Sequence, residues 1–370
     1  MENRKAYHGG GGVYNVIGTD FKNIERNKNV ANADGLDAWF DPSPKAIAKL
    51  SKYLTFSIKT SPPVHGDGLK TAISKYRGIP EENIIIAGGS SDLMFALFPN
   101  LQAKKVLILD PMYGEYKHIF ENVLNNIKLS TYKLLSKNNF EIRKDEFVGL
   151  INKTNPDLVV IVNPNSPAGT FLNKRNVTQI INSIPKKTLF VVDETYVDYV
   201  NPKESVETLV STRRNLIVIK SMSKIYSLSG ARVGYIVASA DIIRKIDRYI
   251  PPFPVSTAAQ ILAIEALKDI EYYKGKWKET SKLREEFIKE LRDIPNIKIY
   301  SGEGNFFLVE LLNKLSGSAQ EVVKKLSEKN VFVRDADSMS EQFHKSYVRI
   351  AVKDADTNKK IVAALKNILK

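Results

Sequence analysis

The stretch from Leu216 to Ala238 reads LIVIKSMSKIYSLSGARVGYIVA and carries the strongest indication of the fold. It begins and ends with short apolar runs, Leu216–Ile219 and Val233–Val237, of the kind that form fully buried strands. Between them come hydroxyl side chains, an amine at Lys224 and a guanidinium at Arg232. Ligand sites in open α/β sheets lie beyond the carboxyl ends of their strands, so this stretch predicts a strand that leads into a polar ligand site.

Similar apolar runs precede this stretch and alternate with helical patterns from about residue 82 to residue 240. They are Ile84–Ile86, Val106–Leu109, Leu158–Val162 and Leu189–Val192. The alternation predicts an α/β domain built on a mostly parallel sheet. We expect this large domain to span residues 41–254, after an extended N-terminal arm at residues 1–40.

A second unit is predicted after Pro251, where several prolines interrupt the chain. A long helical pattern follows from Thr257 to Leu291. Beyond it, strand-like and helical segments alternate, at about 305–309, 319–328, 331–333, 347–350 and from Thr357 onward. Residues 255–370 are therefore expected to form a long helix and a smaller α+β domain.

Composition narrows the class of protein and the kinds of site. The 370 residues include 55 lysines and arginines, 41 acidic residues, four histidines and no cysteine. The lack of cysteine excludes disulfides and thiolate nucleophiles, and with four scattered histidines no metal site is expected. The longest apolar runs hold about five residues, against the ~18 that a membrane span needs, and no targeting segment is indicated. We expect a cytoplasmic protein with no membrane partner.

The net charge of +14 could attract nucleic acid, but the distribution of the charges argues against it. Lysines stand beside acidic residues along the helical segments, and neither a run of five like charges nor a nucleic-acid-binding motif occurs. We therefore expect a solvated basic surface and no nucleic-acid partner.

Two further polar segments follow predicted strands. Asn163-Pro164-Asn165-Ser166-Pro167-Ala168-Gly169 comes after Leu158–Val162, and Asp193-Glu194-Thr195-Tyr196 comes after Leu189–Val192. With the stretch around Lys224 they bring an acid, an amide, a phenol, hydroxyls, an amine and a guanidinium to one rim of the sheet. Each segment alone has an ordinary explanation as a turn or a cap. A nucleophilic lysine needs a carbonyl partner, so a bound aldehyde cofactor would explain the whole set.

The three segments resemble the motifs of one enzyme family. N-P-x-x-P-x-G, D-E-x-Y and S-x-S-K-x-x-x-L-x-G-x-R-x-G-Y occur here in the order found in the aspartate-aminotransferase-like (fold type I, class I/II) family of pyridoxal-5′-phosphate enzymes. The similarity runs over nearly the whole chain. It implies a large domain that binds pyridoxal 5'-phosphate and a smaller C-terminal domain. It also implies a homodimer, because active sites of this family are completed by the neighbouring subunit.

The resemblance implies a role for each motif residue. Lys224 matches the lysine that binds the cofactor as a Schiff base and moves protons. Asp193 matches the carboxylate that pairs with the pyridine nitrogen, and Asn165 and Tyr196 match donors to the phenolic oxygen of the ring. Tyr113 matches the aromatic residue that stacks on the ring. The residues expected to take part in catalysis are Lys224, Asp193 and Tyr196.

A second group of residues is expected to bind the cofactor phosphate. Ser90 and Ser91 follow a predicted strand and open a helical pattern, where backbone N–H groups bind anions. By the resemblance, Ser221, Ser223 and Arg232 match the remaining phosphate ligands of the family.

Substrate binding is expected from both ends of the chain. Arg349 matches the family arginine that binds a terminal anion, and Arg334 matches a second arginine used with phosphorylated substrates. For Arg334 the alternative is a surface ion pair with a neighbouring aspartate. The residues that the resemblance implies in substrate binding are His8, Gly9, Asn32, Asn165, Arg334 and Arg349.

Two subfamilies that act on phosphorylated amino substrates look closest. The main interpretation is a lyase that decarboxylates L-threonine O-3-phosphate to aminopropanol phosphate in cobalamin biosynthesis, favoured by His8-Gly9-Gly10 and Gly114-Glu115-Tyr116. The alternative is a histidinol-phosphate-type aminotransferase that uses 2-oxoglutarate. Two departures weaken it, since no Gly-Thr follows Arg349 and Ser61-Pro62 replaces a Tyr-Pro. A remote alternative, a nucleic-acid-binding or regulatory protein on this fold, would have no need of the Schiff-base lysine.

Overall fold

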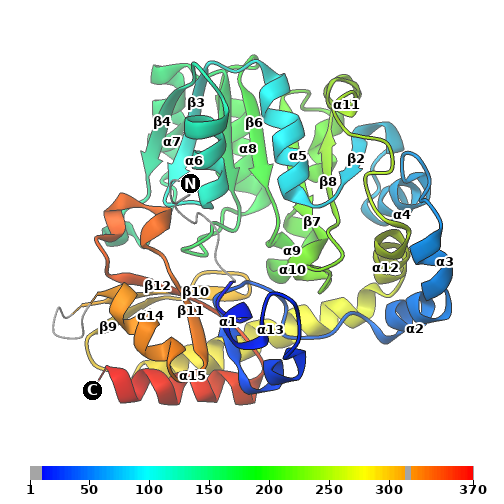
Figure 1. The fold of residues 1–370 in the computed structure, drawn as a ribbon. Helices are drawn as coiled ribbons and strands as arrows, with labels where there is room; N and C mark the ends of the chain where they lie inside the picture. The colour runs from blue at the N-terminus through cyan, green and yellow to red at the C-terminus, as the bar shows by residue number, and fades with distance from the viewer. Residues whose placement is uncertain (1–10, 313–317, 370) are drawn as a thin grey trace.

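Two β-sheets organise the chain in the computed structural model, which describes residues 11–312 and 318–369. The larger sheet contains seven of the described strands and the smaller contains five. Figure 1 shows the larger sheet above the smaller one, with the long helix α13 (Ile270–Leu291) running alongside the smaller sheet.

The larger sheet is parallel except at one strand. Its order is β2 (Ile84–Ala87), β8 (Gly234–Ala238), β7 (Leu216–Ser221), β6 (Leu189–Asp193), β5 (Leu158–Val162), β3 (Lys105–Asp110) and β4 (Lys128–Lys133). β8 pairs antiparallel with both of its neighbours, and the pairs from β7 to β4 are all parallel. The carboxyl ends of β5, β6 and β7 therefore meet at one edge, as the sequence predicted for the polar segments.

The smaller sheet combines the beginning and the end of the chain. Its order is β1 (Ala31–Ala33), β11 (Val331–Asp335), β12 (Tyr347–Ala351), β10 (Phe306–Leu311) and β9 (Ile297–Tyr300). β1 pairs parallel with β11, and the other pairs are antiparallel. The N-terminal segment thus lies against a strand that comes about 300 residues later in the chain.

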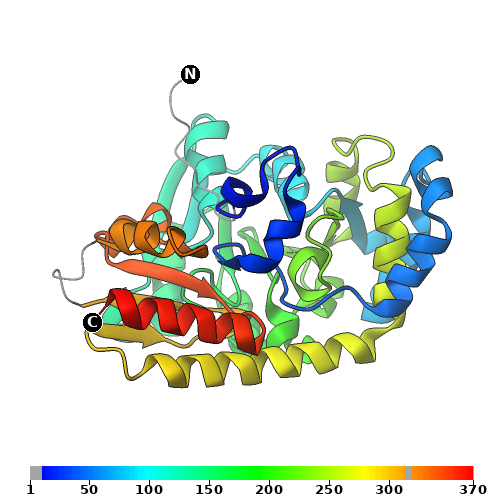
Figure 2. The ribbon, with the colours of Figure 1, turned by 60° about the horizontal axis from the view of Figure 1, so that its bottom comes forward.

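Helices surround both sheets, and Figure 2 shows α13 and α15 side by side along the smaller one. Helices α2, α3 and α4 pack against α12 at one side of the larger sheet. The α-helices of the described residues are α1 (Tyr14–Ile17), α2 (Pro44–Lys52), α3 (Leu54–Lys59), α4 (Asp67–Arg77), α5 (Ser90–Leu97), α6 (Gly114–His118), α7 (Lys144–Thr154), α8 (Lys174–Ser183), α9 (Val197–Val200), α10 (Met222–Ile225), α11 (Ala240–Asp247), α12 (Thr257–Lys268), α13, α14 (Ala319–Ser327) and α15 (Ala355–Ile368). Within the described ranges, none of them is both long and apolar enough to cross a membrane.

The predicted strands of the larger sheet are confirmed, because each is a continuous apolar run that the structure buries on both faces. Three of the described strands were missed: β1, which lies in the segment expected to be an extended arm, β4 and β9. β4 has the sequence KLSTYK and is half-exposed at the sheet edge, and β9 lies at an edge of the smaller sheet. Neither presents the buried apolar run on which the prediction depended.

Two predictions about local structure are wrong. The single helix expected over 257–291 is two helices, because Asp269 leaves the helical conformation with φ −104° and ψ 40°. The extended conformation expected before residue 40 is interrupted, in its described part, by α1 and by a 3-10 helix at Ile24–Asn29, before the strand β1 begins. The division into an arm and two domains stays a prediction.

Candidate active site

A cavity of about 280 Å³ opens at the carboxyl ends of β5, β6 and β7. Val162, Asp193 and Ser221, the last residues of these strands, all line it. The predicted site residues that the structure brings together in its wall are Ser90, Ser91, Tyr113, Asp193, Tyr196, Ser221, Ser223, Lys224, Arg232 and Arg349. Strand ends and helix starts supply most of them, so the parallel topology itself assembles this set.

Asp193 is a buried carboxylate that is held from two sides. Its Oδ1 accepts hydrogen bonds from the backbone N–H of Thr195 at 2.9 Å and from the Thr195 hydroxyl at 2.6 Å. Its Oδ2 accepts one from the Tyr116 hydroxyl at 2.7 Å. Burial raises the pKa of Asp193, and these hydrogen bonds offset part of the rise. The carboxylate is thus fixed in position in the cavity wall.

Lys224 lies in the short helix α10 directly after β7, and its amine reaches into the cavity. Its Nζ lies 2.6 Å from Oδ1 of Asp37 and 3.3 Å from the Ser229 hydroxyl. Burial raises the pKa of Asp37, but the charge of Lys224 and its hydrogen bond outweigh burial, so the pKa lies below its ordinary value. The reactive amine therefore has a carboxylate partner.

An anion-binding corner forms where α5 begins. Ser90 and Ser91 open this helix, and Arg232 approaches so closely that a Cβ at Gly89, where φ is +108°, would lie 2.4 Å from its Nη2. Arg232 also donates to the Ser223 hydroxyl at 3.4 Å. Helix N–H groups, hydroxyls and a guanidinium together match the chemistry of a phosphate group.

Arg349 on β12 brings a second guanidinium to the cavity. It is buried and donates to the Ser166 hydroxyl at 3.1 Å and to the backbone carbonyl of Asp34 at 3.0 Å. Its Nε has no hydrogen-bond partner, and no carboxylate lies within ion-pair distance, among the residues that the structure describes. Burial lowers its pKa to about 10, so the group stays cationic at neutral pH. Such a cation is available to an anionic ligand.

The two tyrosines of the cavity wall are neutral at physiological pH. Burial raises the pKa of Tyr113 to about 12 and raises that of Tyr196 further above its ordinary value. Tyr113 meets the ring of Tyr116 edge to face, with 6.2 Å between centroids, and Tyr196 meets Phe306 in the same way at 5.0 Å. Both phenols can therefore donate hydrogen bonds from fixed rings.

The other predicted residues that the structure describes, Asn32, Asn165 and Arg334, are not in the lining of this cavity. Asn165 is buried nearby, donating to the carbonyl of Pro111 at 3.1 Å while its Oδ1 has no partner among the described residues. Asn32 lies in β1, and Arg334 lies opposite Arg349 in the β11–β12 pair and donates to the Ser338 hydroxyl at 3.0 Å. His8 and Gly9 lie outside the described residues.

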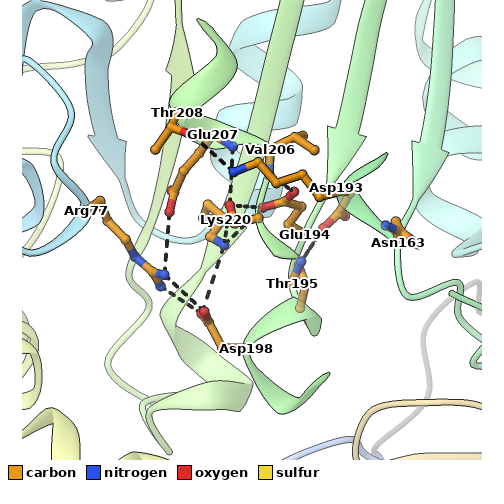
Figure 3. A network of polar contacts seen from close by, with 12 residues as sticks. Arg77, Asn163, Asp193, Glu194, Thr195, Asp198, Val206, Glu207, Thr208 and Lys220 are labelled. Carbon is orange, nitrogen blue, oxygen red and sulfur yellow. Dashed lines mark hydrogen bonds and ion pairs between the residues drawn. The ribbon is translucent and has the colours of Figure 1, made fainter. Parts of the chain in front are cut away.

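A network of buried charges connects the segments that carry the cavity residues (Figure 3). Lys220, on β7, lies 3.1 Å from Oε2 of Glu194 and 4.0 Å from Oδ2 of Asp198. Glu194 follows Asp193 directly, and Asp198 lies two residues after Tyr196. Lys220 itself precedes Lys224 by four residues, so the network joins the segments of all three predicted catalytic residues.

Arg77 on α4 completes this network from outside the sheet. Its guanidinium donates to both carboxylate oxygens of Asp198, at 3.0 and 2.7 Å, and lies 3.5 Å from Oε1 of Glu207. Burial raises the pKa of Asp198, but Arg77 and Lys220 more than compensate and the pKa is lowered. Burial raises the pKa of Glu194 on balance, although Lys220 lowers it in part.

Sequence reasoning missed Asp37, Tyr116 and Thr195 as members of the site. Thr195 stands inside the Asp193–Tyr196 segment, where a hydroxyl two residues after a buried carboxylate is a detectable signal. Asp37 contacts Lys224 across 187 residues and Tyr116 contacts Asp193 across 77, and no local pattern indicates either contact.

The chain is similar to known proteins in both sequence and fold. The family model "Aminotransferase class I and II" matches residues 32–365. Histidinol-phosphate aminotransferase 2 of Archaeoglobus fulgidus is 30% identical over 92% of this chain and 94% of its own. The solved histidinol-phosphate aminotransferase from Clostridium acetobutylicum has a TM-score of 0.81 at 24% identity, covering 91% of this chain and 98% of that one. L-threonine-O-3-phosphate decarboxylase from Porphyromonas gingivalis has a TM-score of 0.76 at 23% identity, with the same coverage of 91% and 98%. These likenesses confirm the predicted fold class.

Proposed function

The chain belongs to the aminotransferase class I and II family, and from that membership we propose that it is a histidinol-phosphate-type aminotransferase. It is a pyridoxal-phosphate-dependent enzyme, as the motifs predicted. The proposed amino donor is a phosphorylated amine of the L-histidinol phosphate class, and the acceptor is 2-oxoglutarate. The relatives support this alternative of the sequence analysis better than its main interpretation, decarboxylation of L-threonine O-3-phosphate.

The residues of the cavity fit the cofactor. The corner at Gly89 and Arg232 leaves no room for a side chain but offers donors to a phosphate. When bound, pyridoxal phosphate supplies an aldehyde to which an amine attaches with loss of water, and a ring that accepts the electrons of a bond broken at the amine-bearing carbon.

The proposed roles of the protein groups follow from their positions. Lys224 supplies the amine and takes up and returns a proton at Nζ. Asp193, held by Thr195 and Tyr116, presents its carboxylate to the ring nitrogen. Tyr196 donates to the phenolic oxygen, and so does Asn165 through the N–H of Nδ2 that the Pro111 carbonyl does not use. Tyr113, which lines the cavity, would pack on the ring. The cofactor phosphate would be bound by Ser90, Ser91, Ser221, Ser223 and Arg232.

The substrate anion is assigned to the C-terminal part of the chain. Arg349 is buried, cationic and without an ion-pair partner among the described residues, so it gains most from an incoming phosphate or carboxylate. Arg334, which lies opposite Arg349 on the neighbouring strand β11, is proposed as a second cation for the substrate. The roles of His8, Gly9 and Asn32 stay predictions from the resemblance.

The cofactor chemistry is supported by one observation: a reactive amine, a buried carboxylate and an anion-binding corner line the same cavity. Transamination of histidinol phosphate, rather than decarboxylation, is favoured by the relatives. The experiment is to add L-histidinol phosphate and 2-oxoglutarate to the cofactor-loaded protein and measure glutamate. Glutamate formed over many turnovers supports the proposal. Its absence, with carbon dioxide released from O-phospho-L-threonine without any keto acid, would establish the decarboxylase instead. The structural likeness to such a decarboxylase keeps it as the second candidate.

The homodimer and the cytoplasmic location stay predictions. The molar mass of the protein in solution, measured by light scattering, tests the homodimer directly.

A further inference from the structure

A second cavity, of about 270 Å³, lies between β3, β4 and the end of α7, and we call it the amino-end cavity. Lys105 and Lys128, the first residues of β3 and β4, line it. The candidate active site lies at the carboxyl ends of β5, β6 and β7, which run parallel to β3. The two cavities are therefore at opposite ends of the strands, and a ligand of the second is separate from the cofactor and substrate of the first.

Three ammonium groups from three different elements line the amino-end cavity. Lys105 belongs to β3, Lys128 to the edge strand β4 (Figure 1), and Lys153 to the last turn of α7. Lys105 and Lys128 are paired residues of adjacent parallel strands, so their like charges lie close together and repel. Among the described residues, no carboxylate lies within ion-pair distance of any of the three amines. Their charge is therefore not neutralised by the protein.

Asp157, directly before β5, does not alter this balance. Its Oδ2 accepts hydrogen bonds from the backbone N–H groups of Lys104 and Lys105, at 2.9 and 2.8 Å, and its side chain is not in the wall of the cavity. These hydrogen bonds, with the charges of Lys105 and Lys187, hold the pKa of Asp157 below its ordinary value. The carboxylate thus fixes the backbone at the start of β3, and Lys187 adds a further cation to the region.

The attachment points of the three amines are fixed by the fold. Val106, Leu107 and Pro156 are buried and supply the apolar part of the cavity wall. Thr154, the last residue of α7, donates its hydroxyl to a backbone carbonyl of its own helix at 2.8 Å. Ser130, two residues after Lys128 on β4, brings a further hydroxyl that can donate to a ligand. The lysines therefore cannot separate without disturbing the sheet, and their repulsion is relieved only by an anion.

We propose that the amino-end cavity binds a small phosphate-containing anion with two or more negative charges, such as a diphosphate group. Such an anion accepts hydrogen bonds from several ammonium groups at once and removes the repulsion between Lys105 and Lys128. Phosphate is favoured over carboxylate because one phosphate group alone carries almost two charges, within a volume that suits the cavity. A nucleic acid needs an extended row of cations, which one cavity does not offer. The inference goes beyond the proposed function and does not depend on it.

The alternative is that these lysines only protect the sheet edge from pairing with another chain, as charged residues on edge strands do. Fully solvated lysines serve that purpose without converging on a cavity. Lys133 is such a residue, because it is exposed at the far end of β4 and does not line the amino-end cavity. It provides the matched control.

The first test titrates the cofactor-loaded protein with inorganic diphosphate in a calorimeter at constant ionic strength. Lys128→Met should weaken the affinity about fivefold, because one charged contact is lost while an apolar stem of similar length remains. Lys128→Arg keeps the charge and should bind within about twofold of the wild type. Lys133→Met removes the same charge from the same strand and should leave the affinity unchanged.

The second test locates the bound anion by acetylating the lysines and measuring each one by mass spectrometry. With diphosphate at twice its dissociation constant, acetylation of Lys105, Lys128 and Lys153 should slow about threefold, and that of Lys133 should not change. Sodium chloride at the same ionic strength should protect none of them, because a monovalent ion does not bridge the amines.

Two results would overturn the inference. If Lys128→Met and Lys133→Met weaken diphosphate binding equally, the anion responds only to the overall positive charge. If diphosphate protects none of the three lysines of the amino-end cavity, it binds elsewhere. A lack of turnover with L-histidinol phosphate would reject the proposed function alone, because neither binding test needs turnover.

Discussion

Lys220 offers the sharpest test of the buried charge network, through the substitution Lys220→Met. Its side chain is fully buried, with Oε2 of Glu194 at 3.1 Å and Oδ2 of Asp198 at 4.0 Å. Methionine is similar in length and apolar, so the change removes the charge while leaving the volume largely filled. What the variant loses is therefore the cation between two buried carboxylates.

The expected loss of stability follows from the partners that remain. Asp198 keeps the two hydrogen bonds from Arg77, whereas Glu194 keeps only neutral donors, the Ser205 hydroxyl and the N–H of Val206, among the described residues. Removing one partner of a buried ion pair costs about 3–5 kcal/mol, because the other charge is left uncompensated. We expect Lys220→Met to lower the free energy of unfolding by that amount.

The pH dependence gives the same prediction a second readout. Burial already raises the pKa of Glu194, and removal of Lys220 raises it further. Protonation then relieves the uncompensated charge, so the loss of stability should be smaller at about pH 6 than at about pH 8. The added substitution Glu194→Gln should likewise recover about 1–3 kcal/mol of the loss.

Urea unfolding, followed by the fluorescence of Trp39 and Trp277, measures these changes. Lys282→Met is the control, because Lys282 is exposed and its nearest carboxylate, on Glu286, lies 3.8 Å away. It should change stability by no more than about 0.5 kcal/mol. A loss below about 1 kcal/mol for Lys220→Met, at either pH, would refute the reasoning.

Three further predictions concern the cavity and its rim. Gly234→Ala should weaken cofactor binding about tenfold in a fluorescence titration, because its Cβ would lie 2.6 Å from the Ser90 nitrogen; Gly230→Ala, with open space, should not. Lys224→Ala should abolish turnover in the glutamate assay yet still bind cofactor, seen by its absorbance. Burial lowers the pKa of Lys353 to about 8, so the unfolded chain is protonated first as pH falls from 10.5. The free energy of unfolding should therefore decrease as the pH is lowered from 10.5 to 8. Lys353→Met should remove this contribution to the pH dependence of stability, as measured by urea unfolding.

The strands of the larger sheet's core were predictable, because a strand buried on both faces has a continuous run of apolar residues. Leu158–Val162 and Leu216–Ser221 are apolar almost throughout and are buried at every position. The edge strand Lys128–Lys133 has no continuous apolar run, because it lies at the edge of the sheet and its side chains are exposed or half-buried. The break between α12 and α13 has none either, since Asp269 is compatible with a helix and its conformation depends on tertiary packing.

The candidate site was predictable where its residues follow strands. Asp193 is the last residue of β6 and Lys224 lies in α10, the short helix directly after β7, so the parallel arrangement of these strands brings them together. Asp37 reaches Lys224 by another route, through a segment held by donors from the other end of the chain. A single sequence contains no periodicity or spacing that reports such a contact.

The pairing of β1 with β11 has a consequence for how the protein is made. Residues 31–37 leave the ribosome early, but the strand that pairs with them and the side chains that hold their carbonyls lie between residues 305 and 353. The cavity wall at Asp37 therefore forms only after nearly the whole chain is synthesised. Contacts of such sequence separation are slow to form, so the larger sheet is expected to fold first and the cavity to close last.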